Sequence, residues 1–216
     1  MMLSLTRRSL AVLGLLLALP VGAQQGAAVK MPAQTPDAVI KSTTDQLQDL
    51  ISKNKATYEA DKAAFYKVVD ELVVPRFDTK YIAQLILARN WRGATPEQRS
   101  RFEVAFKNML IRTYADTMLE YSSQVKAEIK PLRLDPKATD VTVNTNVLRT
   151  SGPPIPVGFS LHVVDGEWKI WDISVENISV ITAFRSQIAA EVKTSSLDAV
   201  IQKLEAGQAI RPVTEG

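Results

Sequence analysis

Hydrophobic and polar residues alternate along two neighbouring stretches of the C-terminal half, which together predict a long β-hairpin. The Asp165-Gly166 pair between them favours a two-residue type I′ turn. The second strand should place Trp168 and Ile170 on one face, and Trp171, Ile173 and Val175 on the other. Large apolar groups on both faces need cover on both sides. That cover is either helices alone, or helices on one side and a bound guest molecule on the other.

The first half of the chain carries the 3.6-residue period of amphipathic helices instead. Thr35-Pro36-Asp37 has the features of a helix start, with Thr35 as the N-cap. The helix it opens should cover residues 35–53, because Asn54 interrupts the pattern. A second helix should end before Pro75, and Asp78 should cap a short third helix.

The longest predicted helix begins at Thr95, which has capping-box spacing with Gln98. Its apolar side is a stripe rich in Phe, Met and Tyr. Such a stripe is usually core, but Met and aromatic side chains also suit a wall around a flexible apolar ligand. The stripe consists of Phe102, Ala105, Phe106, Met109, Leu110 and Thr113, with Tyr114, Met118 and Tyr121 beside it.

The pattern changes at Gln124, after which residues 125–132 and 139–148 predict two strands that precede the hairpin. Two helices follow the hairpin, and Ser196 should cap the last one. Helices, then consecutive strands, then helices again predict an α+β fold with an antiparallel sheet of about four to five strands.

The N-terminus has the layout of a signal peptide: Arg7 and Arg8, an apolar run, and small residues before a cleavage site after Ala23. The apolar run is too short for a membrane span of about 20 residues. We therefore expect an exported protein that is soluble after cleavage, and periplasmic in a bacterium with two membranes. The predicted division is a signal peptide (1–23), a disordered leader (24–34), a single domain (35–210) and a tail (211–216).

Charge and composition exclude several classes of function. Lys and Arg number 26 against 23 Asp and Glu, and removing Arg7 and Arg8 leaves 24 against 23, so nothing indicates a nucleic-acid partner. The absence of cysteine excludes disulfides, thiol nucleophiles and thiolate metal sites. A hydrophobic content of 46% is sufficient for a globular core.

Catalytic chemistry is hard to place on this chain. His162 is the only histidine and falls on the less apolar face of its strand, where we expect a surface residue. The sequence contains no nucleophile elbow, phosphate-binding glycine loop or zinc-protease motif. We therefore predict no catalytic residues, no metal and no cofactor. The alternatives are a cone-shaped isomerase or hydratase with a buried carboxylate in its cavity, and a non-enzymatic adaptor with a filled core.

Two blocks of sequence carry a resemblance to a known family. The first comprises Trp91-Arg92, residues 94–99, Phe102, Tyr114-Ala115 and Tyr121; the second comprises residues 168–173, Val175-Glu176, Ser179 and Arg185-Ser186-Gln187. Together they resemble the MlaC or toluene-tolerance family of periplasmic phospholipid-binding proteins, over about residues 35–207. Asn177 stands where that family typically has Gly, and Ile188 stands where an aromatic residue is common.

The resemblance implies a carrier in the maintenance of outer-membrane lipid asymmetry. Such a carrier shuttles phospholipid between an outer-membrane lipoprotein–porin complex and an inner-membrane ABC transporter with a lipid-binding subunit. It is the transporter's substrate-binding component. The implied fold is a curved antiparallel sheet flanked by helices that enclose an apolar cavity, as in nuclear-transport-factor-like cones. Phospholipid is the cargo, no cofactor is implied, and the family offers no catalytic residues.

The physical need for such a carrier is plain, since hiding each methylene from water is worth roughly 0.8 kcal/mol. We expect the acyl chains inside and the headgroup outside, near Arg92 and Arg185. The alternative for each arginine is a structural role or a surface ion pair, without contact to the headgroup. The predicted lipid-binding residues are Leu85, Trp91, Phe102, Phe106, Met109, Leu110, Tyr114, Phe159, Leu161, Trp171 and Ile173.

Overall fold

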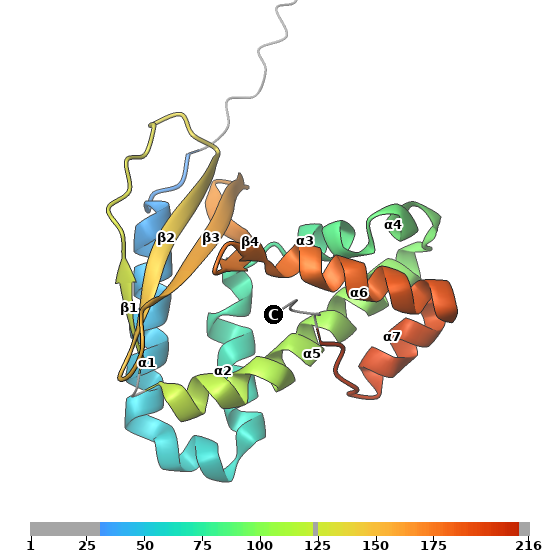
Figure 1. The fold of residues 1–216 in the computed structure, drawn as a ribbon, viewed down its shortest axis with the longest axis horizontal. Helices are drawn as coiled ribbons and strands as arrows, with labels where there is room; N and C mark the ends of the chain where they lie inside the picture. The colour runs from blue at the N-terminus through green and yellow to red at the C-terminus, as the bar shows by residue number, and fades with distance from the viewer. Residues whose placement is uncertain (1–30, 123–124, 212–216) are drawn as a thin grey trace, which may run out of the picture.

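The structure is a computed structural model that describes residues 31–122 and 125–211. The predicted signal peptide, most of the predicted leader and residues 212–216 of the predicted tail lie outside the described residues. In chain order the elements are α1 (Pro36–Ala60), α2 (Lys62–Leu72), the 3-10 helix η1 (Val74–Arg76), α3 (Thr79–Leu87), α4 (Arg89–Gly93), α5 (Pro96–Tyr121), β1 (Val125–Ile129), β2 (Asp140–Arg149), β3 (Ile155–Val164), β4 (Glu167–Val175), β5 (Ile178–Ser179), α6 (Val180–Thr194) and α7 (Leu197–Glu205) (Figure 1).

Local capping signals fix the starts of three helices, as predicted. The Thr95 hydroxyl accepts a hydrogen bond from the N–H of Gln98, and the Gln98 side chain accepts one from the N–H of Thr95, which completes the capping box of α5. The Asp78 carboxylate accepts the N–H of Tyr81 at α3. Ser196 caps α7 in the same way.

Asn54 kinks α1 without ending it. Its φ of −127° and ψ of 17° are not helical, and its side-chain amide donates a 2.9 Å hydrogen bond to the carbonyl oxygen of Leu50. The helix resumes and continues to Ala60, beyond the predicted end at residue 53. Thr35 is the N-cap residue, as predicted, although its side chain makes no capping hydrogen bond.

The strands form one open antiparallel sheet in the order β1-β2-β3-β4-β5, and this confirms the predicted α+β class. Asp165 and Gly166 join β3 to β4 with φ values of 53° and 79°, the positive pair that a type I′ turn requires. Glu176 and Asn177 form a second turn, between β4 and β5, with φ values of 50° and 66°. Asn tolerates this left-handed conformation better than most residues, so it can replace Gly there.

The prediction that β4 is apolar on both faces is wrong, because β4 contains a β-bulge at Trp171. Phe159 pairs with Ile173, but Leu161, two residues further along β3, pairs with Ile170. The extra residue reverses the phase of the alternation, so Ile170 and Ile173 fall on the same face. The sheet therefore has one apolar face and one polar face.

The apolar face packs on the start of α1, where Val39 and Ile40 share a hydrophobic cluster with the sheet. The buried sheet residues of this cluster are Val143, Leu161, Trp168 and Ile170. The opposite face carries small polar side chains, including the exposed Thr142 and Asn144. Gly158 lies among them. Only glycine fits at this position, because a Cβ atom would lie 2.6 Å from Oγ of Ser174.

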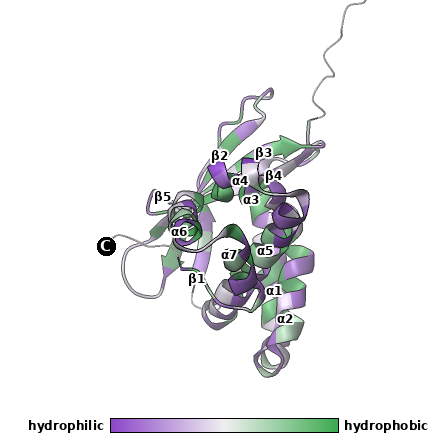
Figure 2. Cartoon of the chain, turned by 90° about the vertical axis from the view of Figure 1, so that its right-hand side faces the viewer, coloured by the Kyte–Doolittle hydropathy of each residue, from purple (hydrophilic) through white to green (hydrophobic). Residues whose placement is uncertain are grey.

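The hydrophobic interior of the described residues is divided into three clusters. A helical cluster joins α3, the first half of α5, α6 and α7; a second cluster joins the end of α1, α2 and the second half of α5; the sheet cluster is the third. Strand β4 packs on α3, α6 and η1, whereas α5 makes at most marginal contact with any strand. Figure 1 shows the sheet and α1 on one side and α3, α6 and α7 on the other. Figure 2 shows that single helices carry both hydrophobic and hydrophilic residues, as amphipathic packing requires.

Candidate functional site

Four of the predicted lipid-binding residues are packed inside the hydrophobic clusters. Phe102, Phe106 and Met109 are between 0% and 3% exposed in the helical cluster, and Leu161 is 0% exposed in the sheet cluster. The ring of Phe106 stacks on Phe102 at 5.6 Å and meets Phe184 edge-on at 5.0 Å. In this conformation these side chains offer no free surface to a guest molecule.

A second set of predicted residues keeps apolar surface exposed along α5. Tyr114 is 40% exposed and Leu110 is half-buried, and the helical period continues their row through Met118 and Tyr121. We call these four residues the α5 stripe. It lies between the side of α5 that enters the helical cluster and the side that packs on α2. Burial raises the pKa of the Tyr114 phenol, while the positive charge of Arg211 acts in the opposite direction.

The apolar face of the sheet is also only partly covered. Phe159 and Ile173 are half-buried at the edge of the sheet cluster, and Val175 and Ile178 are 38% and 48% exposed. Phe77, which follows η1, packs against both the helical cluster and the sheet cluster. Apolar cover is incomplete on the sheet and on α5, and the two make at most marginal contact with each other. Such an arrangement can receive an apolar guest.

Leu85, another predicted residue, is half-buried at the edge of the helical cluster. Trp171 is set apart from the apolar face as the bulge residue of β4. Its ring meets Tyr81 edge-on at 6.2 Å, and its indole N–H is buried without a hydrogen-bond partner. Tyr81 also contacts His162, with ring centroids 5.0 Å apart. His162 is half-buried rather than a free surface residue.

The remaining three predicted residues surround the junction of α3 and α4. Trp91 is half-buried at the edge of the helical cluster, and the guanidinium of Arg99 lies 5.0 Å from its ring centroid. Arg92 is exposed on α4. The Nε of Arg185, on α6, donates a 2.8 Å hydrogen bond to the carbonyl oxygen of Leu85.

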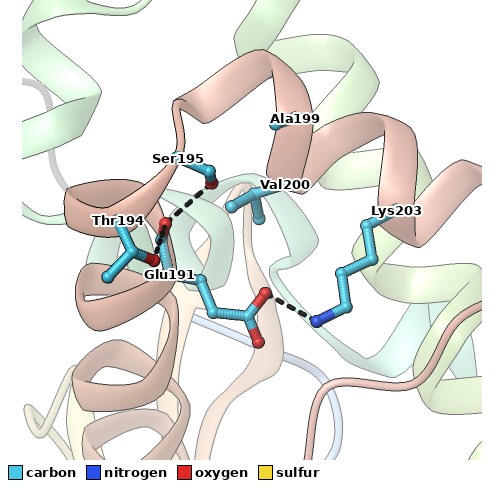
Figure 3. A pocket seen from close by; sticks show the side chains of 6 residues that line it. All are labelled: Glu191, Thr194, Ser195, Ala199, Val200 and Lys203. Carbon is cyan, nitrogen blue, oxygen red and sulfur yellow. Dashed lines mark hydrogen bonds and ion pairs between the residues drawn. The ribbon is translucent and has the colours of Figure 1, made fainter.

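Two surface grooves lie elsewhere, and neither contains a predicted site residue. In the groove between α6 and α7 (Figure 3), Lys203 donates a 2.8 Å hydrogen bond to the Glu191 carboxylate. Thr194 and Ser195 donate their hydroxyl hydrogens to the Glu191 carbonyl oxygen. The polar groups of this groove therefore form hydrogen bonds with one another. The second groove, between α2 and α5, is lined by Tyr66, Lys67, Asp70, Asn108, Ile111 and Arg112.

Across residues 31–122 and 125–211, no three or more His, Asp or Glu side chains gather closely enough to hold a metal ion. Over the same residues, no helix is both long and apolar enough to cross a membrane.

Comparison with known proteins shows which family this is. The family of the MlaC protein matches residues 41–206, and the chain belongs to it. The toluene tolerance protein ttg2D of Pseudomonas putida is 32% identical over 202 residues, which cover 91% of this chain and 87% of that protein. The MlaC binding protein of the intermembrane phospholipid transport system of Haemophilus influenzae is 21% identical over 174 residues, which cover 79% of this chain and 81% of that protein.

A solved structure also resembles this fold. It is the phospholipid-binding protein of Ralstonia solanacearum in complex with a phospholipid, 27% identical to this chain, with a TM-score of 0.71. The superposition covers 79% of this chain and 94% of that one.

Several apolar residues with exposed surface are absent from the predicted lipid-binding residues. Met118 and Tyr121 follow Tyr114 at helical spacing, so their shared row was visible in the sequence. Val175 follows Ile173 by two residues, so their shared face was also visible in the sequence. Ile178 joins that face through its pairing with Val175, which no local pattern predicts.

Proposed function

We propose that this protein is a periplasmic phospholipid carrier that holds the acyl chains of its cargo and leaves the headgroup in water. The observation that carries the proposal is the pair of incompletely covered apolar surfaces, on α5 and on the sheet. The similarity to a protein solved with a phospholipid supports it.

The acyl chains would lie between the α5 stripe and the apolar face of the sheet. Tyr114 and Met118 are each 40% exposed, and Val175 is 38% exposed, so apolar surface is available on both sides. Each methylene that moves from water to such a surface contributes roughly 0.8 kcal/mol. Leu85, Leu110, Phe159 and Ile173 would extend this lining. The buried Phe102, Phe106, Met109 and Leu161 would reach the chains only if the clusters moved apart.

The carrier would exchange cargo with one complex at each membrane. We assign these roles to an outer-membrane lipoprotein–porin complex and to an inner-membrane ABC transporter with a lipid-binding subunit. The name of the Haemophilus relative, a binding protein of an intermembrane phospholipid transport system, supports this assignment. The signal-peptide pattern of the first 23 residues supports a periplasmic location. No catalytic step is part of the proposal.

Native purification followed by lipid extraction tests the proposal. The full chain should be expressed with its own N-terminus, purified without detergent and extracted for mass spectrometry. We expect phospholipid in near-stoichiometric amount, whereas a periplasmic control protein purified in the same way should carry only traces. Equal amounts of lipid in the two samples would refute the carrier function.

A further inference from the structure

We propose that the corner formed by α4 and the end of α3 is a docking surface for an acidic region of a partner protein. Arg89 and Arg92 would make the contact, with Arg185 beside them. This inference goes beyond lipid binding, because it concerns the recognition of a partner protein by exposed arginines.

The corner carries cations without internal partners. Arg89 and Arg92 are exposed, and within residues 31–122 and 125–211 neither guanidinium has an ion pair or a hydrogen bond. Residues 79–96 contain no Asp or Glu. Of the flanking acids, Asp78 pairs with His162 and Glu103 accepts a 2.6 Å hydrogen bond from Thr79. Glu97, in the first turn of α5, acts electrostatically on Arg101 and is outnumbered by Arg89 and Arg92. The positive charge of the corner is therefore not neutralised within the described fold.

The backbone of the corner is strained. Ala88 separates α3 from α4 with φ 47° and ψ −115°, a conformation that residues with a Cβ rarely adopt. Strain of this kind persists only where the surrounding structure enforces it, and it is concentrated at functional sites.

Neighbouring side chains hold the corner in place. Arg185 donates to the carbonyl oxygen of Leu85, which would accept the N–H of residue 89 if α3 continued. The guanidinium of Arg99 stacks on Trp91, and its Nε donates a 3.0 Å hydrogen bond to the Trp91 carbonyl oxygen. The two exposed arginines are thus presented on a supported helix rather than on a loose loop.

The chemistry of the corner favours a protein over a membrane surface. Helices that lie on membranes insert apolar side chains, and residues 79–96 contain no exposed large hydrophobic residue. A few cations alone attract an anionic bilayer only weakly. A guanidinium, in contrast, forms directed paired hydrogen bonds with a carboxylate.

The phosphate of bound cargo is the competing source of negative charge, because Leu85 of the proposed lining lies only four residues before Arg89. The crosslinking experiment distinguishes the two, since a partner protein and a lipid give different crosslinked products.

Site-specific photocrosslinking in cells tests the docking surface. A photoreactive phenylalanine replaces Asn90, between the two arginines, in the full chain, and crosslinked peptides are identified by mass spectrometry. We expect a crosslink to an acidic segment of one membrane-associated protein. Arg89→Glu combined with Arg92→Glu should reduce it at least tenfold, and a reciprocal change of the partner's contacted Glu or Asp residues to Arg should restore it.

Matched controls separate docking from lipid binding and from general charge. Lys126→Glu with Lys130→Glu makes the same charge change at exposed positions on and next to β1, and should leave the crosslink unchanged. Lipid extracted from Arg89→Glu alone should equal that from the unaltered chain, so a failure of docking is distinguishable from a failure of the carrier function.

Three results would overturn the proposal. They are no crosslink from position 90, a crosslink that survives the double charge reversal, and a crosslink to lipid. A vesicle assay tests the membrane alternative, with the purified chain and vesicles that contain 30% phosphatidylglycerol. If the chain binds these vesicles and Arg89→Glu with Arg92→Glu abolishes the binding, the corner contacts a membrane and not a partner protein.

Discussion

Nε2 of His162, on β3, lies 3.0 Å from Oδ2 of Asp78, 84 residues earlier in the chain. The other carboxylate oxygen of Asp78 accepts the N–H of Tyr81, and the Asp78 N–H donates to the carbonyl oxygen of Ile170 on β4. One aspartate therefore joins the sheet to the start of α3. The same strand, β4, also packs on α3, α6 and η1, whereas α5 makes at most marginal contact with any strand.

Replacing Asp78 should weaken both the helix cap and the tie to His162. We expect Asp78→Ala to lower the free energy of unfolding by about 2 kcal/mol, measured by urea denaturation. Asp78→Asn should cost less, because Asn is as good an N-cap as Asp and can still donate to or accept from the imidazole. Equal losses for the two variants would contradict the dual role of this side chain.

Ala88→Gly should stabilise the protein. Glycine adopts the conformation at φ 47° and ψ −115° without the steric strain that Ala88 bears. The strain energy that is relieved exceeds the free-energy cost of the greater entropy of the unfolded chain. We therefore expect the free energy of unfolding to rise by about 1 kcal/mol, measured by thermal or urea denaturation. Ala206, at φ −70°, is the matched control, and Ala206→Gly should not stabilise.

The α5 stripe should matter for cargo more than for folding. Because Tyr114 and Met118 are each 40% exposed, replacing both with Ser should change unfolding free energy little. We expect it to weaken lipid retention roughly tenfold, which corresponds to about 1.4 kcal/mol of lost contact. Bound lipid per chain, measured by mass spectrometry after competition with empty vesicles, gives the readout.

Two controls sharpen the stripe experiment. Val104, 52% exposed on α5 but outside the stripe, should tolerate Val104→Ser without loss of lipid. Phe102 is 0% exposed, so Phe102→Ala should cost about 3–5 kcal/mol of stability. Unchanged lipid retention in the double Ser variant would place the acyl chains elsewhere.

The ion pair between α5 and α7 predicts a specific pH dependence. Arg101 donates hydrogen bonds of 2.9 and 2.8 Å to the two carboxylate oxygens of Glu205, and these bonds lower the pKa of Glu205. Because the folded pKa lies below the unfolded value, the pair contributes stability at neutral pH, and the contribution is lost as pH falls through the folded pKa.

Arg101→Gln should therefore unfold at a slightly lower temperature than the unaltered chain at pH 7. The difference should vanish in acid, well below the ordinary carboxyl pKa of about 4.3. Calorimetry of the two single variants and of Arg101→Gln with Glu205→Gln separates the pair from the individual charges. A difference that persists undiminished in acid would show that Arg101 acts by packing alone.

Local signals in the sequence were sufficient wherever a few neighbouring residues determine the backbone. Thr95 and Gln98 form their capping box with partners three residues apart, and Asp165-Gly166 adopts the predicted turn. The bulge at Trp171 could not be foreseen in this way, because the pairing of β3 with β4 decides where the extra residue lies. His162 was misjudged for a related reason, since its partner Asp78 is distant in sequence.

In the candidate site, too, local sequence patterns predict which residues share a face, whereas tertiary packing decides which of them stay exposed. The row from Leu110 through Tyr114 to Met118 follows from helical periodicity alone. Whether such a row stays exposed depends on how closely the sheet approaches α5, which no local pattern encodes. Phe102 and Phe106 belong to the same apolar side of the helix by sequence, yet α3, α6 and α7 cover them completely.

The polar outer face of the sheet offers a place for spectroscopic probes. Because the chain contains no cysteine, a thiol introduced at the exposed Thr142 and another at the exposed Thr117 would be the sole attachment points for a pair of spin labels. Both sites avoid the buried clusters, so the labels should leave the fold intact. The distribution of distances between them would report directly whether the sheet and α5 separate when the protein takes up its cargo.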